Sequence, residues 1–599
     1  MRIGTLVAVL AIIAVIGLGN SYFLYVATGG LVSYVLISSF NLVYGYGGQL
    51  SLGHTVFYAM GAYATAILTT SFGMSFWISA PLAIVAATIC GLLIAAPTAR
   101  LSGIYLGIGT LALGVAAEEL ITNFTDVTGG INGFTGIQPI ELFGIELIGG
   151  DISFYVLAAV IVLAVAEISY RFTQGAFGWR LVAVRDNETY LKAVAVNPAR
   201  VRLTAFVLSA GSAGLAGVMF AYFTLYISPV SFSIHVVIMV MVALLCGGSG
   251  TFIGPFIGAI VLLLLQEGGH RFGDPSLILG LGIIFFVVVA PSGVAGIVRS
   301  TVEFVRNRGR RQHVLNTEEP DASHQPSEAA IVAGVSALMG DRDAGGTLEV
   351  RNLRVQFGGL VAVNDFSITV EPGKVVGLIG ANGAGKTTAV NAITGLVKPV
   401  SGSIQLGGEE LRGMAPYSIA ARGLVRTFQR AQMVESHDLV TNVALAMTSR
   451  KRSTLLEDVL FVGRAKSEQR EAIERAWEIL RGLNLESYAR SKPGDVPYGV
   501  VRLAEIGRAI AQRPQILLLD EPGAGLTAAE RDNLATVIRS LAASGVGVLL
   551  IDHNVSLVAG VSTTMQAMVS GITIATGTPD EVLADPRVIE SYLGSAVKS

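Results

Sequence analysis

The sequence has few charged residues and very few cysteines. Of its 599 residues only 14% are Asp, Glu, Lys or Arg, against roughly 25% in an ordinary soluble domain. The two cysteines, Cys90 and Cys246, both lie in apolar runs, which argues against a disulfide framework or a cysteine metal site. The net charge of −2 gives no electrostatic basis for nucleic-acid binding. A disulfide-stabilised or nucleic-acid-binding protein is therefore not indicated.

Apolar residues are abundant and unevenly distributed. Mean hydropathy is +0.62, and residues 1–170 carry far fewer charges than residues 299 onward. Runs of roughly 17–25 apolar residues are long enough to cross a bilayer. About ten runs qualify: 4–19, 22–44, 53–72, 76–97, 104–122, 152–170, 203–223, 233–247, 252–269 and 275–291. The first is interpreted as an uncleaved span, because no small-residue cleavage site stands out after it.

Lysine and arginine positions predict the orientation of these spans. Basic residues occur after the sixth span, from Arg171 to Arg202, and after the last span, from Arg299 to Arg311. Loop 123–151 has aspartate and glutamate but no lysine or arginine. With ten spans, the N-terminus and both basic segments lie in the cytoplasm, and Arg271 is the one basic residue on the wrong side. The sequence therefore predicts a polytopic α-helical domain followed by a cytoplasmic half.

Polar residues interrupt the membrane half at residues 41–54, NLVYGYGGQLSLGH. Glycine-rich irregular backbone at membrane depth is tolerated only where it is buried in protein or lines a cavity. We therefore predict that this stretch contributes to the translocation path, and a tight interfacial turn is the alternative. The path candidates are Asn41, Gln49, Ser51 and His54.

Glu118 and Glu119 lie near the outer end of the fifth span. Carboxylates inside a membrane are functional candidates, but hydration near the interface favours a simple interfacial position. Residues 178–198 are too charged to span. They are either an ordinary loop or a short helix that docks on another protein surface. In the second case the candidate docking residues, here called the coupling segment, are Arg185, Asp186, Asn187 and Glu188.

Residues 380–387, GANGAGKT, fit the phosphate-loop pattern between an apolar strand, 375–379, and a predicted helix, 388–395. Glycines let backbone N–H groups close on phosphate oxygens, and the helix dipole favours the anion. Lys386 supplies a positive charge and Thr387 a hydroxyl for Mg²⁺. The predicted ATP-binding residues are Gly380, Asn382, Gly383, Ala384, Gly385, Lys386, Thr387 and Thr388.

A second nucleotide motif follows at residues 516–521, an apolar strand that ends in Asp520 and Glu521. Asp520 suits a Mg²⁺ ligand through water, and Glu521 suits the base that polarises attacking water. His553 follows a later apolar strand and is predicted to contact a γ-phosphate or its water, although a lone histidine is more often structural. Phe357 is predicted to stack on adenine, with a core ring as the alternative.

From residue 347 onward, strands alternate with amphipathic helices, which indicates an α/β core with a largely parallel sheet.

Taken together, these patterns predict three parts. Residues 1–300 form the transmembrane domain, residues 301–346 a basic segment and flexible linker, and residues 347–599 the nucleotide-binding domain. The linker is polar and flanked by Pro and Gly, and its apolar island at 329–339 is too short to span.

Over roughly residues 30–295 the chain resembles the M-type permeases of branched-chain amino-acid ABC importers, and from residue 347 it resembles their G-type ATPases. The motifs that carry the resemblance are residues 41–54, RLSGIYL (100–106), TGGING (128–133), GGSGTFIGP (247–255), FGGLVAV (357–363), RTFQ (426–429), DEPGAGL (520–526) and DPRVIESYLG (585–594). The resemblance implies that Phe357 stacks on adenine and that Gln429 senses Mg²⁺ and coupling. It also makes His553 the switch histidine and residues 178–198 the coupling helix.

The ABC signature, usually LSGGQ, reads VPYGV at residues 496–500. Pro497 replaces the serine, Tyr498 and Gly499 form the Y-G pair also seen in G-type relatives, and a helix is predicted at 501–512. Thr527 replaces the aspartate of the D-loop. These losses weaken the composite site that receives this signature, so we predict a hetero-oligomer.

The resemblance implies half of an ABC importer, located in a bacterial plasma (inner) membrane with its ATPase domain in the cytoplasm. Its cofactors are ATP and Mg²⁺, and its solute is a branched-chain amino acid or a similar small polar molecule. Its partners are a second permease, a second ATPase and an extracytoplasmic solute-binding protein, with no nucleic acid. Alternatives are an importer of urea, short amides or aromatic acids, an exporter or flippase, and a membrane-tethered regulatory ATPase.

Overall fold

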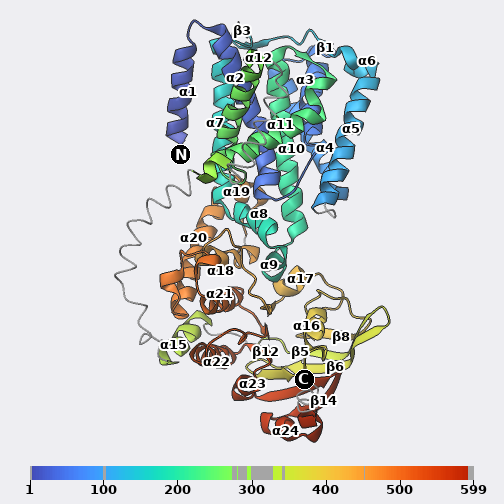
Figure 1. Cartoon of the computed structure of the whole chain (residues 1–599), viewed down its shortest axis with the longest axis vertical. Coiled ribbons are helices and arrows are strands. Elements are labelled where there is room, and N and C mark those ends of the chain that lie inside the picture. The colour runs from blue at the N-terminus through green and yellow to red at the C-terminus, as the bar shows by residue number, and fades with distance from the viewer. Residues whose placement is uncertain are drawn as a thin grey trace. The chain divides into compact units, whose positions relative to one another are not determined.

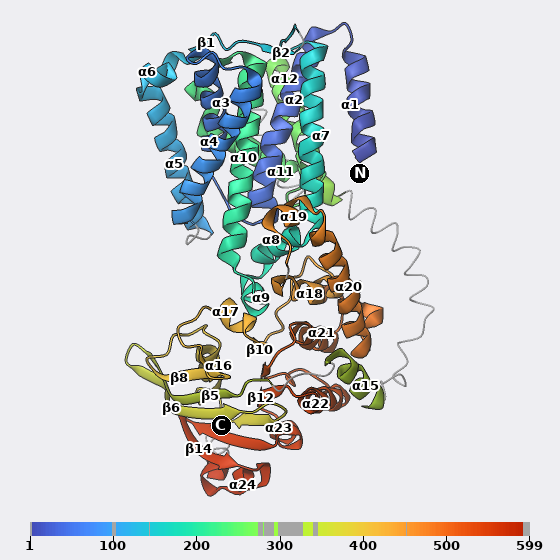
Figure 2. The same cartoon turned by 180° about the vertical axis from the view of Figure 1, so that it is seen from behind.

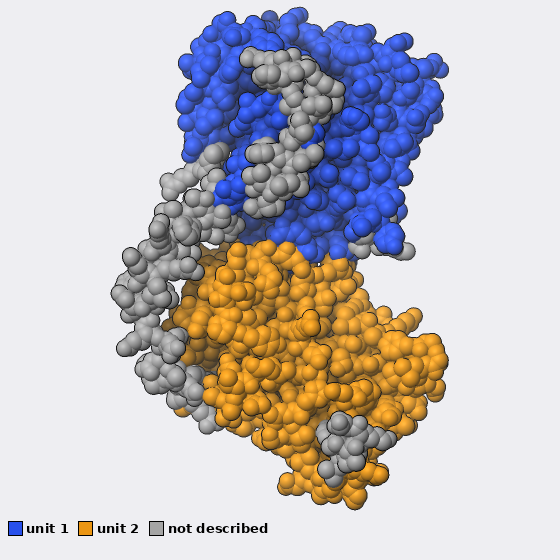
Figure 3. Space-filling view, in the orientation of Figure 1, with its two compact units in different colours: residues 1–185, 199–319, 459–461 blue, residues 186–198, 320–458, 462–599 orange. Residues whose placement is uncertain are grey.

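The computed structural model places most of the chain in two compact units, which Figure 3 distinguishes by colour. It describes residues 3–98, 103–142, 144–272, 280, 293–297, 328–339, 345–450 and 452–590. The first unit comprises residues 1–185, 199–319 and 459–461, and the second comprises 186–198, 320–458 and 462–599. Residues 186–198, although flanked by membrane helices in sequence, thus belong to the second unit.

The first unit is a bundle of apolar helices (Figure 1). Its helices are α1 (Ile3–Gly17), α2 (Ser21–Phe40), α3 (Thr55–Thr70), α4 (Phe76–Thr98), α5 (Ile104–Asn123), α7 (Ile152–Gln174), α8 (Ala176–Asp186), α10 (Pro198–Thr224), α11 (Ile234–Gly247) and α12 (Gly254–Phe272). Each of the first nine predicted spans coincides with one of these helices. In the described residues, six helices are long and apolar enough to cross a membrane. The tenth span, 275–291, Arg100 and the basic residues after the last span lie outside the described residues.

Helix α2 forms the centre of this bundle, where it packs against α7, α11 and α12. Its side chains Val35, Ile37 and Phe40 are fully buried. Elsewhere small residues let helix backbones meet: a Cβ added at Gly61 on α3 would lie 2.1 Å from the carbonyl oxygen of Gly214 on α10. Close approach of backbones is the usual basis of helix association in membranes, where apolar side chains gain little by leaving lipid.

Loop 123–151 is organised by short elements and not left as irregular chain. These are α6 (Thr125–Thr128), η2 (Gly130–Asn132), β1 (Phe134–Thr135), β2 (Ile140–Leu142) and β3 (Ile145–Leu147). Strand β1 pairs antiparallel with β4 (Tyr226–Ile227), and β2 pairs antiparallel with β3. The pairing with β4 ties this loop to the C-terminal end of α10.

The second unit contains two sheets. The larger has the strand order β10-β11-β12-β7-β13-β14, and every neighbouring pair except β13–β14 is parallel. Its strands are β7 (Val375–Ile379), β10 (Leu424–Arg426), β11 (Ile516–Asp520), β12 (Gly547–Ile551), β13 (Thr564–Val569) and β14 (Ile572–Gly577). The predicted largely parallel sheet is confirmed. An antiparallel sheet of order β6-β5-β8-β9 was not predicted: β5 (Leu348–Phe357), β6 (Leu360–Val370), β8 (Ser401–Leu406) and β9 (Glu409–Glu410).

The second unit also contains helices. They are α9 (Glu188–Ala193), α15 (Glu328–Met339), α16 (Lys386–Ile393), α17 (Pro416–Ala421), α18 (Leu439–Leu445), α20 (Arg464–Gly482), α21 (Tyr498–Ala511), α22 (Ala528–Ala543), α23 (Val555–Val561) and α24 (Pro579–Ala584), with the first part of α19 (Leu455–Leu460) between α18 and α20. Two predicted boundaries were wrong. The helix after the phosphate loop begins at Lys386, inside the motif. The signature helix begins at Tyr498, directly after Pro497, which is its N-cap residue.

The apolar island of the predicted linker is a packed helix, α15. Its side chains Val335, Leu338 and Met339 are buried, and the helix packs against α20 and α22, as both views show (Figures 1 and 2). Arg475 of α20 donates a hydrogen bond to the carbonyl oxygen of Leu338. Three apolar residues on one face of a helix too short to span are therefore buried against protein.

Candidate functional site

The predicted nucleotide residues line one cavity of about 690 Å³ in the second unit. Its lining is Phe357, Leu360, Val361, Ala362, residues 382–388, Gln429, Glu521, His553 and Ser570. Gly380 and Asp520, which were also predicted, are not among these lining residues. Sequence reasoning missed Leu360, Val361, Ala362 and Ser570, because nothing in their residue types indicates nucleotide binding.

Strand order explains why these distant residues meet. Strand β12 lies between β7 and β11, with Ile551 paired to both Leu378 and Asp520. The backbone N–H of Glu521 donates to the carbonyl oxygen of Ile551 at 2.7 Å. Carboxyl ends of parallel strands share one sheet edge, which is where α/β proteins bind ligands. The phosphate loop, the two acidic residues and His553 are therefore adjacent.

The glycines of the phosphate loop are required by packing as well as by phosphate access. Gly380, Gly383 and Gly385 have φ values of 154°, 81° and 99°, which disfavour other residues. A Cβ at Gly380 would lie 2.2 Å from the carbonyl oxygen of Met568, and one at Gly385 would lie 2.4 Å from that of Ala362. The loop is thus held against β13 and β6 before any ligand is considered.

Lys386 is buried and its ammonium faces the loop. Its Nζ donates to the carbonyl oxygens of Gly380 at 2.7 Å and Ala381 at 3.0 Å. Burial lowers the pKa of Lys386, while the carboxylates of Glu521 and Asp520 oppose that shift. The geometry places a cation beside the phosphate loop, as predicted.

Glu521 is the centre of the site. Its Oε1 lies 2.8 Å from His553 Nε2, and its Oε2 accepts a hydrogen bond from Gln429 Nε2 at 2.8 Å. Its φ of 48° is in the left-handed region, which is strained for a residue with a side chain and is found mostly at functional sites. Two side chains from neighbouring strand ends therefore fix the direction of this carboxylate.

Asp520 has the features of a Mg²⁺ ligand. It is 1% exposed, and its Oδ2 accepts from Arg426 Nη2 at 2.7 Å. Among the described residues its buried Oδ1 has no hydrogen-bond partner. A buried carboxylate oxygen without a partner fits an oxygen-preferring cation bound through water. Burial lowers the pKa of Arg426, and Asp520 opposes that shift.

The signature-like residues lie apart from this lining. Pro497 precedes α21, and Tyr498 and Gly499 form its first turn. A Cβ at Gly499 would lie 2.0 Å from Glu530 Oε1, so a larger residue here would displace the Glu530 carboxylate. Thr527, which the sequence analysis treated only as the loss of the D-loop aspartate, caps α22. Thr527 Oγ1 accepts from the N–H of Glu530 at 3.3 Å, and Glu530 Oε2 accepts from the N–H of Thr527 at 2.8 Å.

The coupling segment makes specific contacts within the second unit. Asp186 Oδ2 accepts from the N–H of Ser436 at 3.2 Å. Asn187 Nδ2 donates to Gln432 Oε1 at 2.9 Å and to the Met433 carbonyl oxygen at 3.3 Å. The other two predicted residues make contacts within their own segments or the first unit. Arg185 donates to the Gly45 carbonyl oxygen at 2.7 Å, and Glu188 pairs with Lys192 at 2.9 Å.

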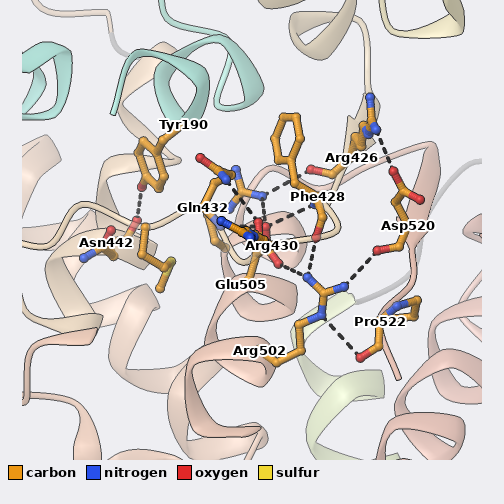
Figure 4. Close-up of polar contacts among 12 residues, drawn as sticks. Tyr190, Arg426, Phe428, Arg430, Gln432, Asn442, Arg502, Glu505, Asp520 and Pro522 are labelled. Atoms are coloured by element: carbon orange, nitrogen blue, oxygen red, sulfur yellow. Dashed lines mark hydrogen bonds and ion pairs between the residues drawn. The ribbon is translucent and has the colours of Figure 1, made fainter. Parts of the chain in front are cut away.

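Tyr190 is a contact residue that sequence analysis did not select. It is fully buried, and its hydroxyl donates to the carbonyl oxygen of Asn442 (Figure 4). The guanidinium carbon of Arg508 lies 5.4 Å from the centre of its ring. A tyrosine in a short polar segment flanked by helices is the only sequence signal that points to this contact.

The predicted path residues are buried in the first unit. Asn41 Oδ1 accepts from the N–H of Gly250 at 2.8 Å, and its Nδ2 donates to the Thr251 carbonyl oxygen at 3.0 Å. His54 Nε2 lies 3.0 Å from Ser39 Oγ. Gln49 and Ser51 are also buried, with Gln49 Oε1 and Ser51 Oγ unpartnered among the described residues.

Backbone in this stretch is irregular, as predicted: a π-helix, η1 (Asn41–Tyr46), is followed by residues without helical structure. Burial favours irregular backbone enclosed in protein over an exposed interfacial turn, while a role in the path stays a prediction. At the end of α5, Glu118 is half-buried and Glu119 is exposed.

A phosphate loop, a strand ending in two acids and a histidine on the next strand end define an ATP-binding ATPase, here preceded by a bundle of apolar helices. Family comparison agrees. The family described as "Branched-chain amino acid transport system / permease component" matches residues 22–290, "ABC transporter" matches residues 363–524, and "Branched-chain amino acid ATP-binding cassette transporter" matches residues 573–598.

Curated relatives match the ATPase half. The high-affinity branched-chain amino acid transport ATP-binding protein BraF of Pseudomonas aeruginosa is 40% identical over 250 residues, covering 42% of this chain and 98% of the relative. LivG of Escherichia coli K12, with the same description, is 37% identical over the same shares. The chain belongs to the branched-chain amino acid ABC transporter family, with a permease domain and an ATPase domain in one polypeptide. A solved ABC-transporter cassette in its ADP conformation is 29% identical, with a TM-score of 0.36 over 42% of this chain and 99% of that one.

Proposed function

We propose that this chain forms half of an importer that uses ATP to take up a branched-chain amino acid or a similar small polar solute. The observation that carries the proposal is Glu521, held between Gln429 and His553 beside a phosphate loop, in a chain whose other half matches an importer permease family. The printed names of the curated relatives support a branched-chain amino acid as solute. Urea, short amides and aromatic acids are the alternatives for the same architecture.

The residues of the cavity take separate roles in this proposal. Lys386 and the backbone of the phosphate loop bind the phosphates, and Phe357, half-exposed at the mouth, stacks on adenine. Thr387 would hold Mg²⁺ through its hydroxyl and Asp520 would hold it through water, with Gln429 as its sensor, and the ion would supply neutralisation of the phosphate charge. Glu521 accepts a proton from the attacking water. His553 lies 2.8 Å from Glu521 and orients its carboxylate, and in this proposal it also contacts the γ-phosphate of bound ATP.

A second ATPase subunit completes the site in this proposal. The signature turn at Pro497 does not line this chain's own cavity, so the site must receive a signature from another subunit. Pro497 has no N–H to donate. In a homodimer both composite ATP sites would therefore lack a hydrogen-bond donor to the γ-phosphate. We therefore infer a hetero-oligomer with a second permease, a second ATPase and an extracytoplasmic solute-binding protein. The basic segments support a cytoplasmic ATPase domain, and the proposed location of the chain is a bacterial inner membrane.

The test is transport by the full chain in vesicles, alone and with the subunits that co-purify with it. We expect uptake of radiolabelled leucine only with the partners, with ATP and with the solute-binding protein, and little ATPase activity from the chain alone. Uptake of urea or benzoate in place of leucine would select an alternative solute. Solute-independent ATPase activity together with ATP-driven efflux would indicate an exporter, and full activity from the chain alone would contradict the hetero-oligomer.

A further inference from the structure

Glu505 is a fully buried carboxylate on the signature helix, α21, outside the cavity lining. Arg502 and Arg508 lie three residues before and after it on the same helix face. Arg502 Nη1 donates to Glu505 Oε2 at 2.7 Å, and Arg508 Nη2 lies 3.5 Å from Oε1. All three side chains are 0% exposed. Buried charges are costly unless paired and hydrogen-bonded, so this triad needs the contacts described next.

The same carboxylate holds the segment that presents Gln429. Its Oε1 accepts from the backbone N–H groups of Phe428 at 3.3 Å and Gln432 at 3.2 Å. Gln429 lies between these two anchor points, and its amide reaches Glu521. The position of the Gln429 amide therefore depends on where Glu505 holds residues 428–432. Figure 4 shows Glu505 beside Phe428, Gln432 and Arg502.

Arg502 extends the network to the other side of Glu521. Its guanidinium donates to the backbone carbonyl oxygens of Asp520 at 2.8 Å, Glu521 at 2.7 Å and Pro522 at 3.3 Å (Figure 4). These carbonyls belong to the turn in which Glu521 has its left-handed φ of 48°. A strained conformation persists only where its surroundings fix it, and Arg502 supplies three of the bonds that fix this one.

Residues 186–198 meet the same network from the opposite side. Asn187 donates to the side chain of Gln432, whose backbone N–H donates to Glu505. Arg508 lies against the ring of Tyr190 and donates to the Arg426 carbonyl oxygen at 3.2 Å. Arg508 Nε and Nη1 have no hydrogen-bond partner in the described part of the chain, so the Tyr190 ring supplies the remaining contact of this cation.

We propose that Glu505 is a positioning residue that links the seating of residues 186–198 to the alignment of Glu521 for hydrolysis. Asn187 and Tyr190 set the position of residues 428–432 and of Arg508, and Glu505 transmits that position through its backbone and arginine contacts. When the segment is displaced, Gln429 and the turn that carries Glu521 lose their shared anchor. This inference concerns the ATPase reaction and holds for any transported solute.

The experiment is a double-mutant cycle on kcat in the full chain with its co-purifying subunits, using Mg²⁺ and ATP as the probes. We expect Glu505→Gln to lower kcat ~10-fold and to leave the affinity for ATP unchanged, because the phosphate contacts are intact. Asn187→Ala should lower kcat in the wild-type background and have no further effect in the Glu505→Gln background, since interacting residues are non-additive.

Two further variants separate positioning from folding. Glu505→Asp keeps the charge that the arginines need and shortens its reach to residues 428 and 432, so it should lower kcat without lowering the unfolding temperature. Asp458→Asn is the matched control, because Asp458 is also buried, at 5% exposure, and its Oδ1 accepts from Ser453 Oγ at 2.8 Å. This control should leave kcat unchanged.

Three results would overturn the proposal: unchanged kcat in both Glu505 variants, kcat and ATP affinity that fall together with the unfolding temperature, or an Asn187→Ala effect of the same size in both backgrounds. None of these three measurements uses solute uptake. Failure of the importer proposal would be seen in a different result, in which the wild-type complex hydrolyses ATP without transporting solute.

Discussion

The two units bury polar groups in different ways. In the first unit the buried polar side chains of residues 41–54 are neutral, and Asn41 and His54 bond to neighbouring backbone or hydroxyl groups. In the second unit full charges are buried, among them Arg502, Glu505 and Asp520. Charges are expensive at membrane depth, whereas a site for a phosphate ester and a cation requires them. Burial alone therefore does not identify function, because its meaning depends on the kind of group buried.

The difference also changes what a sequence motif means. The predicted residues of the second unit come from five separate stretches, at Phe357, 382–388, Gln429, Glu521 and His553, and converge on one cavity. Residues 41–54, which carry part of the family resemblance, make packing contacts instead: Asn41 joins η1 to the turn at Gly250 and Thr251. Changes at the cavity residues of the second unit should thus alter chemistry with little change in stability, and changes at residues 41–54 of the first should alter stability first. The following predictions test that contrast.

The largest effect is expected for Glu521→Gln. The change removes the base and keeps the phosphate contacts, so turnover should fall roughly 10²–10⁴-fold while ATP still binds. Single-turnover hydrolysis and nucleotide titration of the assembled complex measure the two quantities. Glu581→Gln, an exposed glutamate in the capping box of α24, is the control. Near-normal hydrolysis in Glu521→Gln would remove this residue from its proposed role.

Lys386→Ala should affect binding and not only turnover. Its ammonium is the charged side chain of the phosphate loop, and hydrogen bonds to charged groups contribute about 1.5–3 kcal/mol, so ATP affinity should fall about 10–100-fold. Lys398→Ala, at an exposed position of the same domain, should leave affinity unchanged. Equal affinity of the Lys386 variant and the wild type would contradict the assignment of the phosphate loop.

Asn41→Leu should act on the first unit alone. It leaves the N–H of Gly250 and the carbonyl of Thr251 without their side-chain partner, at a cost of about 1–3 kcal/mol. Thermal unfolding in detergent should show the loss, and ATP binding should not change. Asn123→Leu, at an exposed end of α5, is the matched control. A variant of wild-type stability that transports poorly would instead favour a direct role of Asn41 in the path.

Thr527→Ala should have the smallest effect. Loss of the N-cap of α22 costs roughly 0.5–2 kcal/mol and should appear in chemical denaturation without a change in ATP affinity. Thr527→Asp restores the residue usual at this position in the D-loop and remains a good cap, so it should match the wild type in stability. If Thr527→Asp proves as unstable as Thr527→Ala, the capping box does not explain the threonine.

Local patterns predicted much of this protein correctly. Nine apolar runs and the strands at residues 375–379 and 516–520 follow from residue types and spacing. Residue types point to Phe357, Glu521 and His553, and the family resemblance points to Gln429. All four line the cavity, while their roles in the reaction stay predictions. The sequence could not show that Leu360 and Ser570 line the cavity, or that Tyr190 and Glu505 take part in one network. Their residue types are compatible with many positions, and their partners lie tens to hundreds of residues away.

The amino-acid sequence by itself determined the division into a membrane half and an ATPase half and the identity of the phosphate-binding chemistry, because hydropathy and motif spacing act over short stretches. Only the tertiary structure decided that residues 186–198 belong with the ATPase unit, that 329–339 pack as α15, and that Glu505 joins Gln429 to the turn of Glu521. Those facts depend on which strands and helices become neighbours, and the free energy of that choice is spread over long-range contacts that no local pattern records.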